Sequence, residues 1–308
     1  MDPQLLLSDL KGELAALTAA CFWALASVLY SRVGTKIPPI VLNLIKGLVA
    51  IALLLLTILL GGQLLPKIDL QALSLLLISG MVGLGVGDTA FFTTLQNLGP
   101  RRTLLMETLA PPLTAIFAWL FLGETISATA WCGILLIILG VAWVIAERVE
   151  GGSSDRRNYL QGISWALVAE LCQATGATLS RQALITTTIS PLWSTLLRLL
   201  GGTFILLLWV AIARPKWQQS RRWWEEGRSP RTLITIFMAI LFGTYFGIWL
   251  QQTAFKFTAV GIAQALSATS PLFVLPLAVW MGDKLSFRSV LGVILALIGI
   301  ALLFVVRL

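Results

Sequence analysis

The 308-residue sequence contains no histidine, few cysteines and little charge. Without histidine, the protein lacks the commonest metal ligand and the commonest general base. Its three cysteines, Cys21, Cys132 and Cys172, lie in apolar stretches without the spacing of metal ligands, so we interpret them as buried apolar residues. No segment resembles a nucleotide-hydrolysing loop. We therefore expect no metal, no cofactor and no disulfide.

Charged residues make up 12% of the chain, against about 25% in an ordinary soluble domain. Hydrophobic residues make up 57% and the mean hydropathy is +0.90, which leaves too little polar surface to cover a core in water. A bilayer is the solvent that fits, and a helix crosses it in about 20 residues. Apolar runs of this length lie at residues 12–31, 39–60, 71–93, 103–122, 128–146, 160–181, 191–213, 232–254, 261–281 and 288–306. We predict an all-α integral membrane protein with ten transmembrane helices.

The net charge of +8 would suit a nucleic-acid partner, but the basic residues are dispersed among short loops between the runs. Membrane proteins show this pattern, so we expect the lipid bilayer as a partner and no nucleic acid. An even number of runs puts both termini on one side, where five Lys and Arg lie against fifteen on the other side. The positive-inside rule then predicts both termini outside, in a multi-pass protein of the plasma membrane. We expect a monomer or a homodimer.

Two stretches share one layout at an offset of 159 residues, ETLAPPLTAIFAWLFLGETIS from Glu107 and LSATSPLFVLPLAVWMGDKLS from Leu266. The matching positions are Pro112 and Pro271, Gly123 and Gly282, Glu124 and Asp283, and Ser127 and Ser286. Glycines of the last helices repeat at the same offset, Gly133 with Gly292 and Gly140 with Gly299. Nearer the starts of the halves, Leu10 matches Leu160, and Lys46 matches Arg198 at an offset of 152.

Each half contains five runs, an odd number, so the second half begins on the opposite side of the membrane. The halves therefore form an inverted-topology repeat, with a pseudo-twofold axis in the membrane plane and a substrate cavity at their interface. We place the first five-helix repeat at residues 10–147 and the second at residues 158–307, joined by a short polar linker.

Five plus five runs, an early proline in runs four and nine, and the exits FLGETIS and WMGDKLS resemble the EamA-type transporters of the drug/metabolite transporter superfamily. The resemblance covers roughly residues 10–306. It implies a transporter rather than an enzyme. Similar proteins are amino-acid exporters, metabolite permeases and carriers of sugar phosphates or nucleotide sugars, so the substrate stays open. They more often keep both termini inside, which disagrees with the count of basic residues.

Prolines interrupt the fourth and ninth runs at Pro111, Pro112, Pro271 and Pro276. Proline removes a backbone donor and displaces the carbonyl four residues earlier, which hydrocarbon tolerates only beside protein or a water-filled cavity. We expect helix kinks that either border the substrate cavity or merely shape the packing. Glu124, which follows the helix-ending Gly123, either caps the next helix near Ser127 or helps to hold the closed transporter together.

Ionisable residues inside membrane spans are costly and usually functional. The candidates for substrate binding or coupling are Lys46, Asp88, Glu107, Glu170 and Arg198, with Gln173 one turn beyond Glu170. Lys46 and Arg198 either clamp an anionic or zwitterionic substrate from opposite sides, or snorkel to headgroups or pair with a carboxylate. Asp88 follows the glycine-rich stretch GMVGLGVG, which no strand precedes. That stretch predicts close helix packing rather than a dinucleotide-binding loop.

Glu170 lies near the middle of the sixth run, and its first-half counterpart is Ala20, so it is not a packing feature inherited by both halves. It either exchanges a proton for a cationic or zwitterionic substrate, or forms a fixed ion pair with Arg198 that braces the sixth and seventh helices.

The sequence thus predicts a secondary transporter, a permease or exporter that moves a small metabolite such as an amino acid or an organic ion by alternating access, with proton coupling as one option. The alternative is an integral membrane enzyme acting on a lipid-soluble substrate. Such enzymes usually cluster His, Asp or Arg at a membrane surface, whereas here the ionisable residues are scattered singly along the helices.

Overall fold

Helices form nearly all of the chain that the structure describes. The computed structural model describes residues 10–33, 38–62, 66, 68–146, 156–213, 229–274 and 287–305, and no strand occurs among them. The first half contains α2 (Lys11–Val33), α3 (Pro39–Leu60), α4 (Leu70–Ser79), η1 (Gly80–Gly87), α5 (Asp88–Glu107), α6 (Ala110–Leu122) and α7 (Ala128–Ala146). The second half contains α8 (Arg156–Thr186), α9 (Pro191–Ala213), α11 (Pro230–Ile240), η2 (Leu241–Phe246), α12 (Gly247–Phe257), α13 (Val260–Ser267) and α15 (Phe287–Val305).

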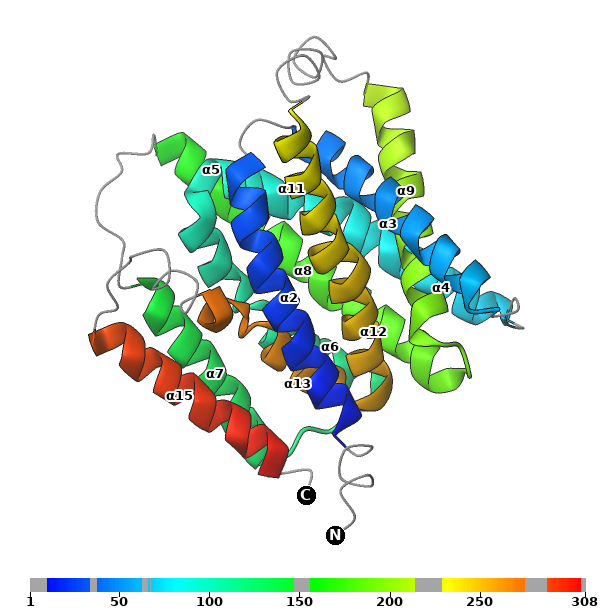
Figure 1. Cartoon of the computed structure of the whole chain (residues 1–308). Coiled ribbons are helices and arrows are strands. Elements are labelled where there is room, and N and C mark those ends of the chain that lie inside the picture. Colours follow the sequence, from blue (N-terminus) through cyan, green and yellow to red (C-terminus); the bar gives the residue numbers. More distant parts are fainter. Residues whose placement is uncertain are drawn as a thin grey trace.

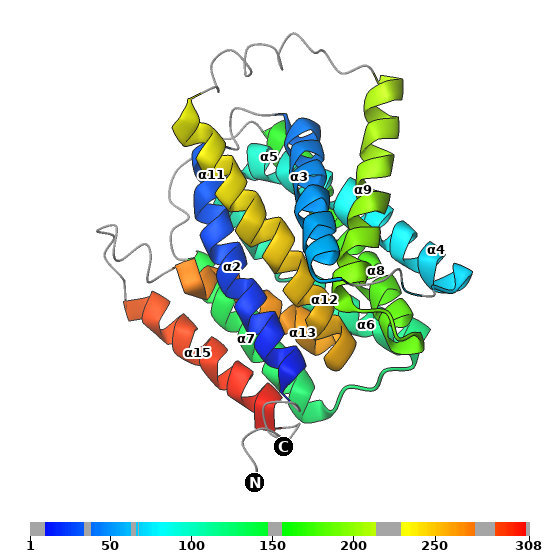
Figure 2. The same cartoon turned by 45° about the vertical axis from the view of Figure 1, so that its right-hand side comes forward.

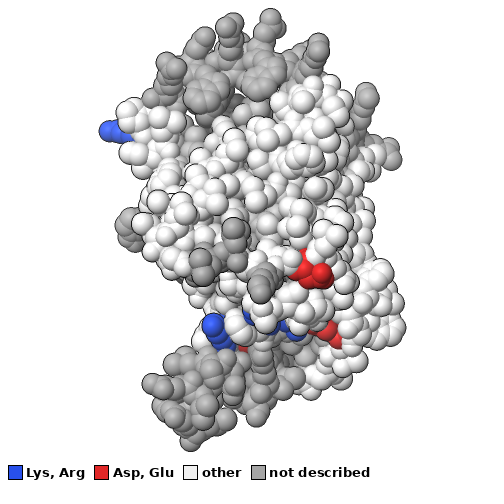
Figure 3. Space-filling model, turned by 90° about the vertical axis from the view of Figure 1, so that its right-hand side faces the viewer, with Lys and Arg blue, Asp and Glu red and all other residues white. Residues whose placement is uncertain are grey.

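These helices supply ten membrane spans, as the composition predicts. Five segments are long and apolar enough to cross a membrane, by length and composition: Lys11–Tyr30, Pro39–Leu60, Leu70–Leu98, Pro191–Ile212 and Pro230–Phe257. Four shorter apolar helices and the 31-residue α8 complete the set, the ninth span being described as far as residue 274. On the face in Figure 3, nearly all of the described surface is neither acidic nor basic, as a surface in hydrocarbon must be.

The last helices of the two halves, α7 and α15, pack side by side along one edge of the molecule (Figures 1 and 2). A Cβ atom at Gly299 would lie 2.7 Å from the carbonyl oxygen of Gly133, and one at Gly140 would lie 2.5 Å from that of Gly292. Gly133 and Gly292 are equivalent in the repeat, as are Gly140 and Gly299, so each contact is the twofold image of the other. Equivalent helices that pack antiparallel confirm the inverted topology.

The start of α2 and the end of α15 lie on one side of the molecule, at the bottom of Figure 1. We call this the terminal side. The turns that follow α3, α6, α8 and α12 lie on it too, because successive spans alternate in direction.

The third and eighth spans each contain a π-helix at an equivalent place. η1 joins α4 to α5, and η2 joins α11 to α12. Side chains of neighbouring helices donate to carbonyl groups in these segments: Asn43 Nδ2 donates to Leu84 O at 2.8 Å, and Trp23 Nε1 donates to Gly243 O at 2.7 Å. Leu84 and Gly243 are 159 residues apart, so different donors satisfy the same carbonyl of each repeat.

The glycines of η1 allow close approach of the backbones of α8 and α9, which confirms the predicted packing role. A Cβ atom at Gly83 would lie 3.6 Å from Cα of Gly176 in α8. A Cβ atom at Gly202 in α9 would lie 3.0 Å from the carbonyl oxygen of Gly80. The third span is thereby held between α8 and α9, two helices of the second half.

The fourth span begins differently from the prediction. The helical run of α5 continues through the expected loop to Glu107, and the break comes at residues 108–109. Pro111 and Pro112 then lie in the first turn of α6, where the missing N–H costs nothing, rather than kinking a continuous helix. Pro271 likewise lies in a helical segment, residues 270–274, that starts after a turn at residues 268–269, whereas Pro276 lies outside the described residues.

The cysteines also differ from the prediction. All three are free, as expected, but Cys21 and Cys132 are exposed and Cys172 is only half-buried. An apolar side chain has no need of burial when its solvent is lipid. Gly123 does end α6 in the left-handed conformation, with φ of +66°, as the sequence predicts.

Candidate functional site

Lys46 and Asp88 form an ion pair between α3 and α5, in the middle of the membrane spans. The side chain of Lys46 is 9% exposed and that of Asp88 is 23% exposed, so the pair is largely withdrawn from solvent. Lys46 Nζ also lies 5.2 Å from the ring centroid of Phe92, which Tyr30 contacts edge-on. Of the two roles open to Lys46, the structure shows pairing with a carboxylate.

Asn43, one turn before Lys46, orders the backbone beside this pair. Its Nδ2 group donates to Leu84 O, to Gly85 O at 3.3 Å and to Thr89 Oγ1 at 3.0 Å. Asn43 was not predicted from the sequence, although it is a polar residue in an apolar run and lies on the same helix face as Lys46.

Arg198 is buried in α9, with 1% of the residue exposed. Its guanidinium lies against η1, since a Cβ atom at Gly83 would be 3.2 Å from Nη2. Within the part of the chain that the structure describes, Nε and Nη1 have no hydrogen-bond partner. Arg198 therefore does not snorkel to a headgroup layer, because a snorkelling side chain would be exposed at its tip.

The ion pair between Arg198 and Glu170, one of the two roles considered for Glu170, is not formed. Among the described residues, the ion pairs are Lys46 with Asp88 and Arg181 with Glu124. The guanidinium of Arg198 lies instead beside Gly83 of η1, where the absence of a side chain leaves room for it.

Glu170 lies near the middle of α8 and is 4% exposed. Its carboxylate is close enough to that of Glu107 for their charges to interact, and Glu107 interacts in the same way with Asp88. Gln173, one turn along α8, is half-buried. The predicted residues therefore form two groups. Lys46, Asp88 and Arg198 make up the first, Glu107 and Glu170 make up the second, and the interaction of Glu107 with Asp88 links them.

A second polar network closes the terminal side. Arg181 Nε donates to Glu124 Oε1 at 2.6 Å, and Arg181 Nη1 donates to the carbonyl groups of Phe255 at 2.5 Å and Lys256 at 3.0 Å. Glu124 Oε2 accepts from the backbone N–H of Val260 at 3.1 Å. The carboxylate of Glu124 thus joins α8 to the start of α13, and the guanidinium of Arg181 adds the end of α12.

Of the two roles predicted for Glu124, the structure favours the one that holds helices together. Ser127 itself caps α7, accepting from the backbone N–H of Ala130 at 3.2 Å. Just inside this network, the side-chain oxygen of Gln252 accepts from Ser180 and from Ser194, the latter at 2.8 Å. Arg181 was not among the predicted site residues, because it lies in the last turn of its run and counted as a loop cation.

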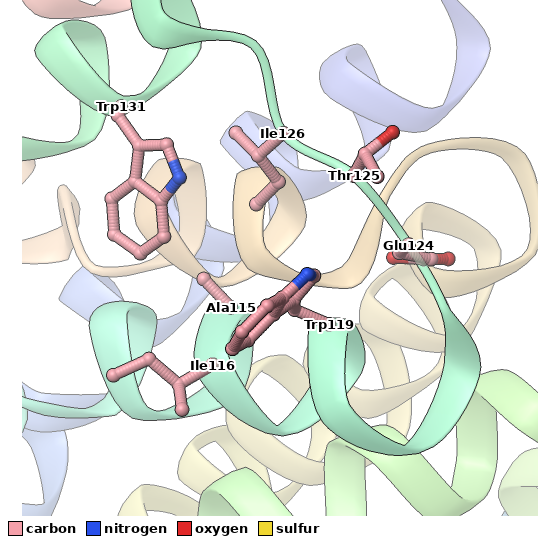
Figure 4. Close-up of a pocket in the computed structure, with 7 residues that line it drawn as sticks. All are labelled: Ala115, Ile116, Trp119, Glu124, Thr125, Ile126 and Trp131. Carbon is pink, nitrogen blue, oxygen red and sulfur yellow. The ribbon is translucent and has the colours of Figure 1, made fainter.

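A pocket of about 380 Å³ lies beside this network at the end of α6 (Figure 4). Its lining residues are Ala115, Ile116, Trp119, Glu124, Thr125, Ile126 and Trp131. Both carboxylate oxygens of Glu124 are engaged by Arg181 and Val260, and none of the buried charges near η1 reaches this pocket. We therefore place the candidate site at the buried charges rather than here.

The chemistry available at the buried charges is that of ion binding. In the part of the chain that the structure describes, no group of three or more His, Cys, Asp and Glu could hold a metal ion. Lys46 and Arg198 offer two cations, and Asp88, Glu107 and Glu170 offer three carboxyl groups, between helices of both halves.

The two repeats of this fold can each be compared with known protein families. The sequence profile of the EamA-like transporter family matches residues 10–146 and again residues 160–305. The chain belongs to the EamA-like transporter family. It is therefore a multi-pass membrane transporter of the drug/metabolite transporter superfamily.

Relatives of this EamA-like protein carry transporter names without a substrate. An "Uncharacterized transporter" of Archaeoglobus fulgidus is 25% identical over 94% of this chain and 96% of its own length. The "Uncharacterized transporter YvbV" of Bacillus subtilis is 26% identical over 62% of this chain, a match that covers 59% of that relative. A solved crystal structure superimposes with a TM-score of 0.74 over 96% of this chain and 97% of its own, at 18% identity, which shows a shared fold.

Proposed function

We propose that this EamA-like protein is a secondary transporter that carries a small metabolite by alternating access, without a cofactor. The observation that carries the proposal is the set of buried charges Lys46, Glu170 and Arg198 on α3, α8 and α9, beside the half-buried Asp88 and Glu107 of α5. Charges at this depth are costly, and a scaffold or an anchor has no use for them. A transported ion or zwitterion does have a use for them, since it needs partners along its route.

We propose Glu170 as the coupling residue. It is buried near the middle of α8, has no ion-pair partner among the described residues, and shares its surroundings with Glu107. Two carboxyl groups buried close together compete for one proton or one cation. A carboxyl group in that situation can exchange a proton for a cationic part of a substrate.

The test is transport by the purified protein in proteoliposomes, with and without an imposed pH gradient, over a panel of amino acids and organic ions. We expect Glu170→Gln to insert and fold normally but to lose the pH-gradient-driven component, because glutamine keeps the shape and cannot titrate. The matched control is Asp69→Asn, an exposed acidic residue that precedes α4 and makes no side-chain capping bond. Wild-type rates and an unchanged pH profile in Glu170→Gln would reject the coupling role.

A further inference from the structure

Arg198 forms no ion pair with any residue that the structure describes, and the repeat gives a reason. Lys46 and Arg198 are equivalent positions and both are buried. Lys46 has an acidic partner, Asp88, on the third span of its own half. At the offset of 159 residues Asp88 corresponds to Gly247, and the whole eighth span, Pro230–Phe257, contains no acidic residue. The second half thus has Arg198 as the equivalent of Lys46 but has no acidic residue equivalent to Asp88.

No protein group in the described structure takes the place of that acid. Nε and Nη1 of Arg198 have no hydrogen-bond partner, although the residue is 1% exposed. Asp88 is near enough to act on the charge of Arg198, but its carboxylate is bound to Lys46. A buried guanidinium with free N–H groups is unstable in isolation, because neither water nor an anion replaces its lost hydration.

We propose that Arg198 binds the carboxylate of the transported solute, and that the solute carries one such anionic group. This rests on the proposed transport function and deepens it. The planar fork of a guanidinium matches a carboxylate with two parallel hydrogen bonds. A solute with two anionic groups finds no second cation here, because Asp88 already neutralises Lys46.

The first test measures binding without transport. Purified full-length protein in detergent is heated with propionate, phenylacetate, succinate or inorganic phosphate, and with propionamide or phenylacetamide, at constant ionic strength. We expect the two monocarboxylates to raise the melting temperature with concentration by at least about 2 °C, while the amides do not. Arg198→Gln abolishes the rise. The proposal is overturned if neither monocarboxylate stabilises the protein, if phosphate or succinate stabilises it more, or if Arg198→Gln responds like the wild type.

The second test needs no ligand. Replacing an unpaired buried charge by an apolar side chain of similar size removes a destabilising group, so Arg198→Met melts above the wild type. The matched control is Lys46→Met at the equivalent position, which leaves Asp88 buried without its partner and melts below the wild type. A lowered melting temperature or a failure to fold in Arg198→Met would show that Arg198 has a structural partner, and would refute the proposal.

The two tests separate this inference from the transport function. If proteoliposomes transport solutes without a carboxylate, and Arg198→Gln transports them as fast as the wild type, the protein is a transporter and the inference is wrong. If monocarboxylates bind through Arg198 and no gradient drives any of them across the membrane, the transport function fails and the binding site stands. A third variant, Asp88→Asn, removes the carboxylate that neutralises Lys46, so Lys46 becomes available as a second cation. The affinity for succinate should then rise at least tenfold relative to that for propionate.

Discussion

If the protein works by the proposed alternating access, the network on the terminal side must break and re-form in each cycle. Glu124 is the centre of that network, because its two oxygens accept from Arg181 on α8 and from the start of α13. The first-half counterpart of Arg181, at an offset of 150 residues, is Ser31. A contact that holds one side closed favours one state of the cycle, so weakening it should favour the other state. We predict that Glu124→Gln opens the terminal side.

The size of the effect follows from the contacts. The side chains of Arg181 and Glu124 are 14% and 13% exposed, so the pair is mostly withdrawn from solvent. A hydrogen bond to a charged group contributes about 1.5–3 kcal/mol, and glutamine keeps one acceptor while losing the charge. We therefore expect a loss of about 2–3 kcal/mol, which changes the ratio of closed to open molecules by about 30- to 150-fold.

The assay is the labelling rate of a single cysteine placed beneath the network. Ser194 is fully buried and donates to Gln252, so Ser194→Cys, in a background without the three native cysteines, reports on opening from the terminal side. A membrane-impermeant thiol reagent should react with it 10-fold or more faster when Glu124→Gln is added. The control is Thr125→Val, an exposed neighbour in the same turn. Equal labelling rates in the two backgrounds would refute the idea that this network holds the terminal side closed.

Two further predictions concern helix packing, and both are checked by thermal unfolding followed with intrinsic fluorescence. Gly140→Ala should cost about 1–3 kcal/mol, because its methyl group would meet a backbone carbonyl of α15 at 2.5 Å. Gly162→Ala would meet side-chain atoms of α5 rather than a carbonyl, Leu98 at 2.5 Å and Cβ of Asn97 at 3.1 Å, so it should cost clearly less. Equal losses would contradict the argument. Asn43→Leu and Trp23→Phe should each cost about 1–3 kcal/mol, because each leaves a carbonyl of a π-helix without its donor. A variant as stable as the wild type would mean that water or another group replaces the donor.

The span count and the inverted repeat could be predicted from the sequence because both follow from coarse patterns. Apolar runs of membrane length leave little choice of structure, and an odd number of spans per half fixes the relative orientation of the halves. The glycines of α7 and α15 were identified as repeated positions, and their mutual contact is what twofold symmetry requires. The orientation of the termini and the boundaries of the two repeats stay predictions.

The pairing of buried charges could not be predicted in the same way. Glu170 and Arg198 lie on consecutive spans, which made them plausible partners, but the rotation of each helix decides which side chains meet. That rotation depends on the π segments of the central spans, which depart from the 3.6-residue period on which face assignments rest. Arg181 and Glu124 meet across 57 residues of chain, through a turn whose path the sequence pattern does not specify.

Each π-helix also changes the direction in which side chains point, between the part of the span before it and the part after it. An i→i+5 turn holds one residue more than an α-turn, so side chains after it are rotated by about 100° relative to an uninterrupted helix. In the third span, Gly80 at the start of η1 packs against the backbone of Arg198 in the second half, and Asp88 directly after η1 pairs with Lys46 of the first half. Deleting one residue from η1 would remove this change of direction, and one helix could no longer both pack against the backbone of α9 and pair Asp88 with Lys46 of α3.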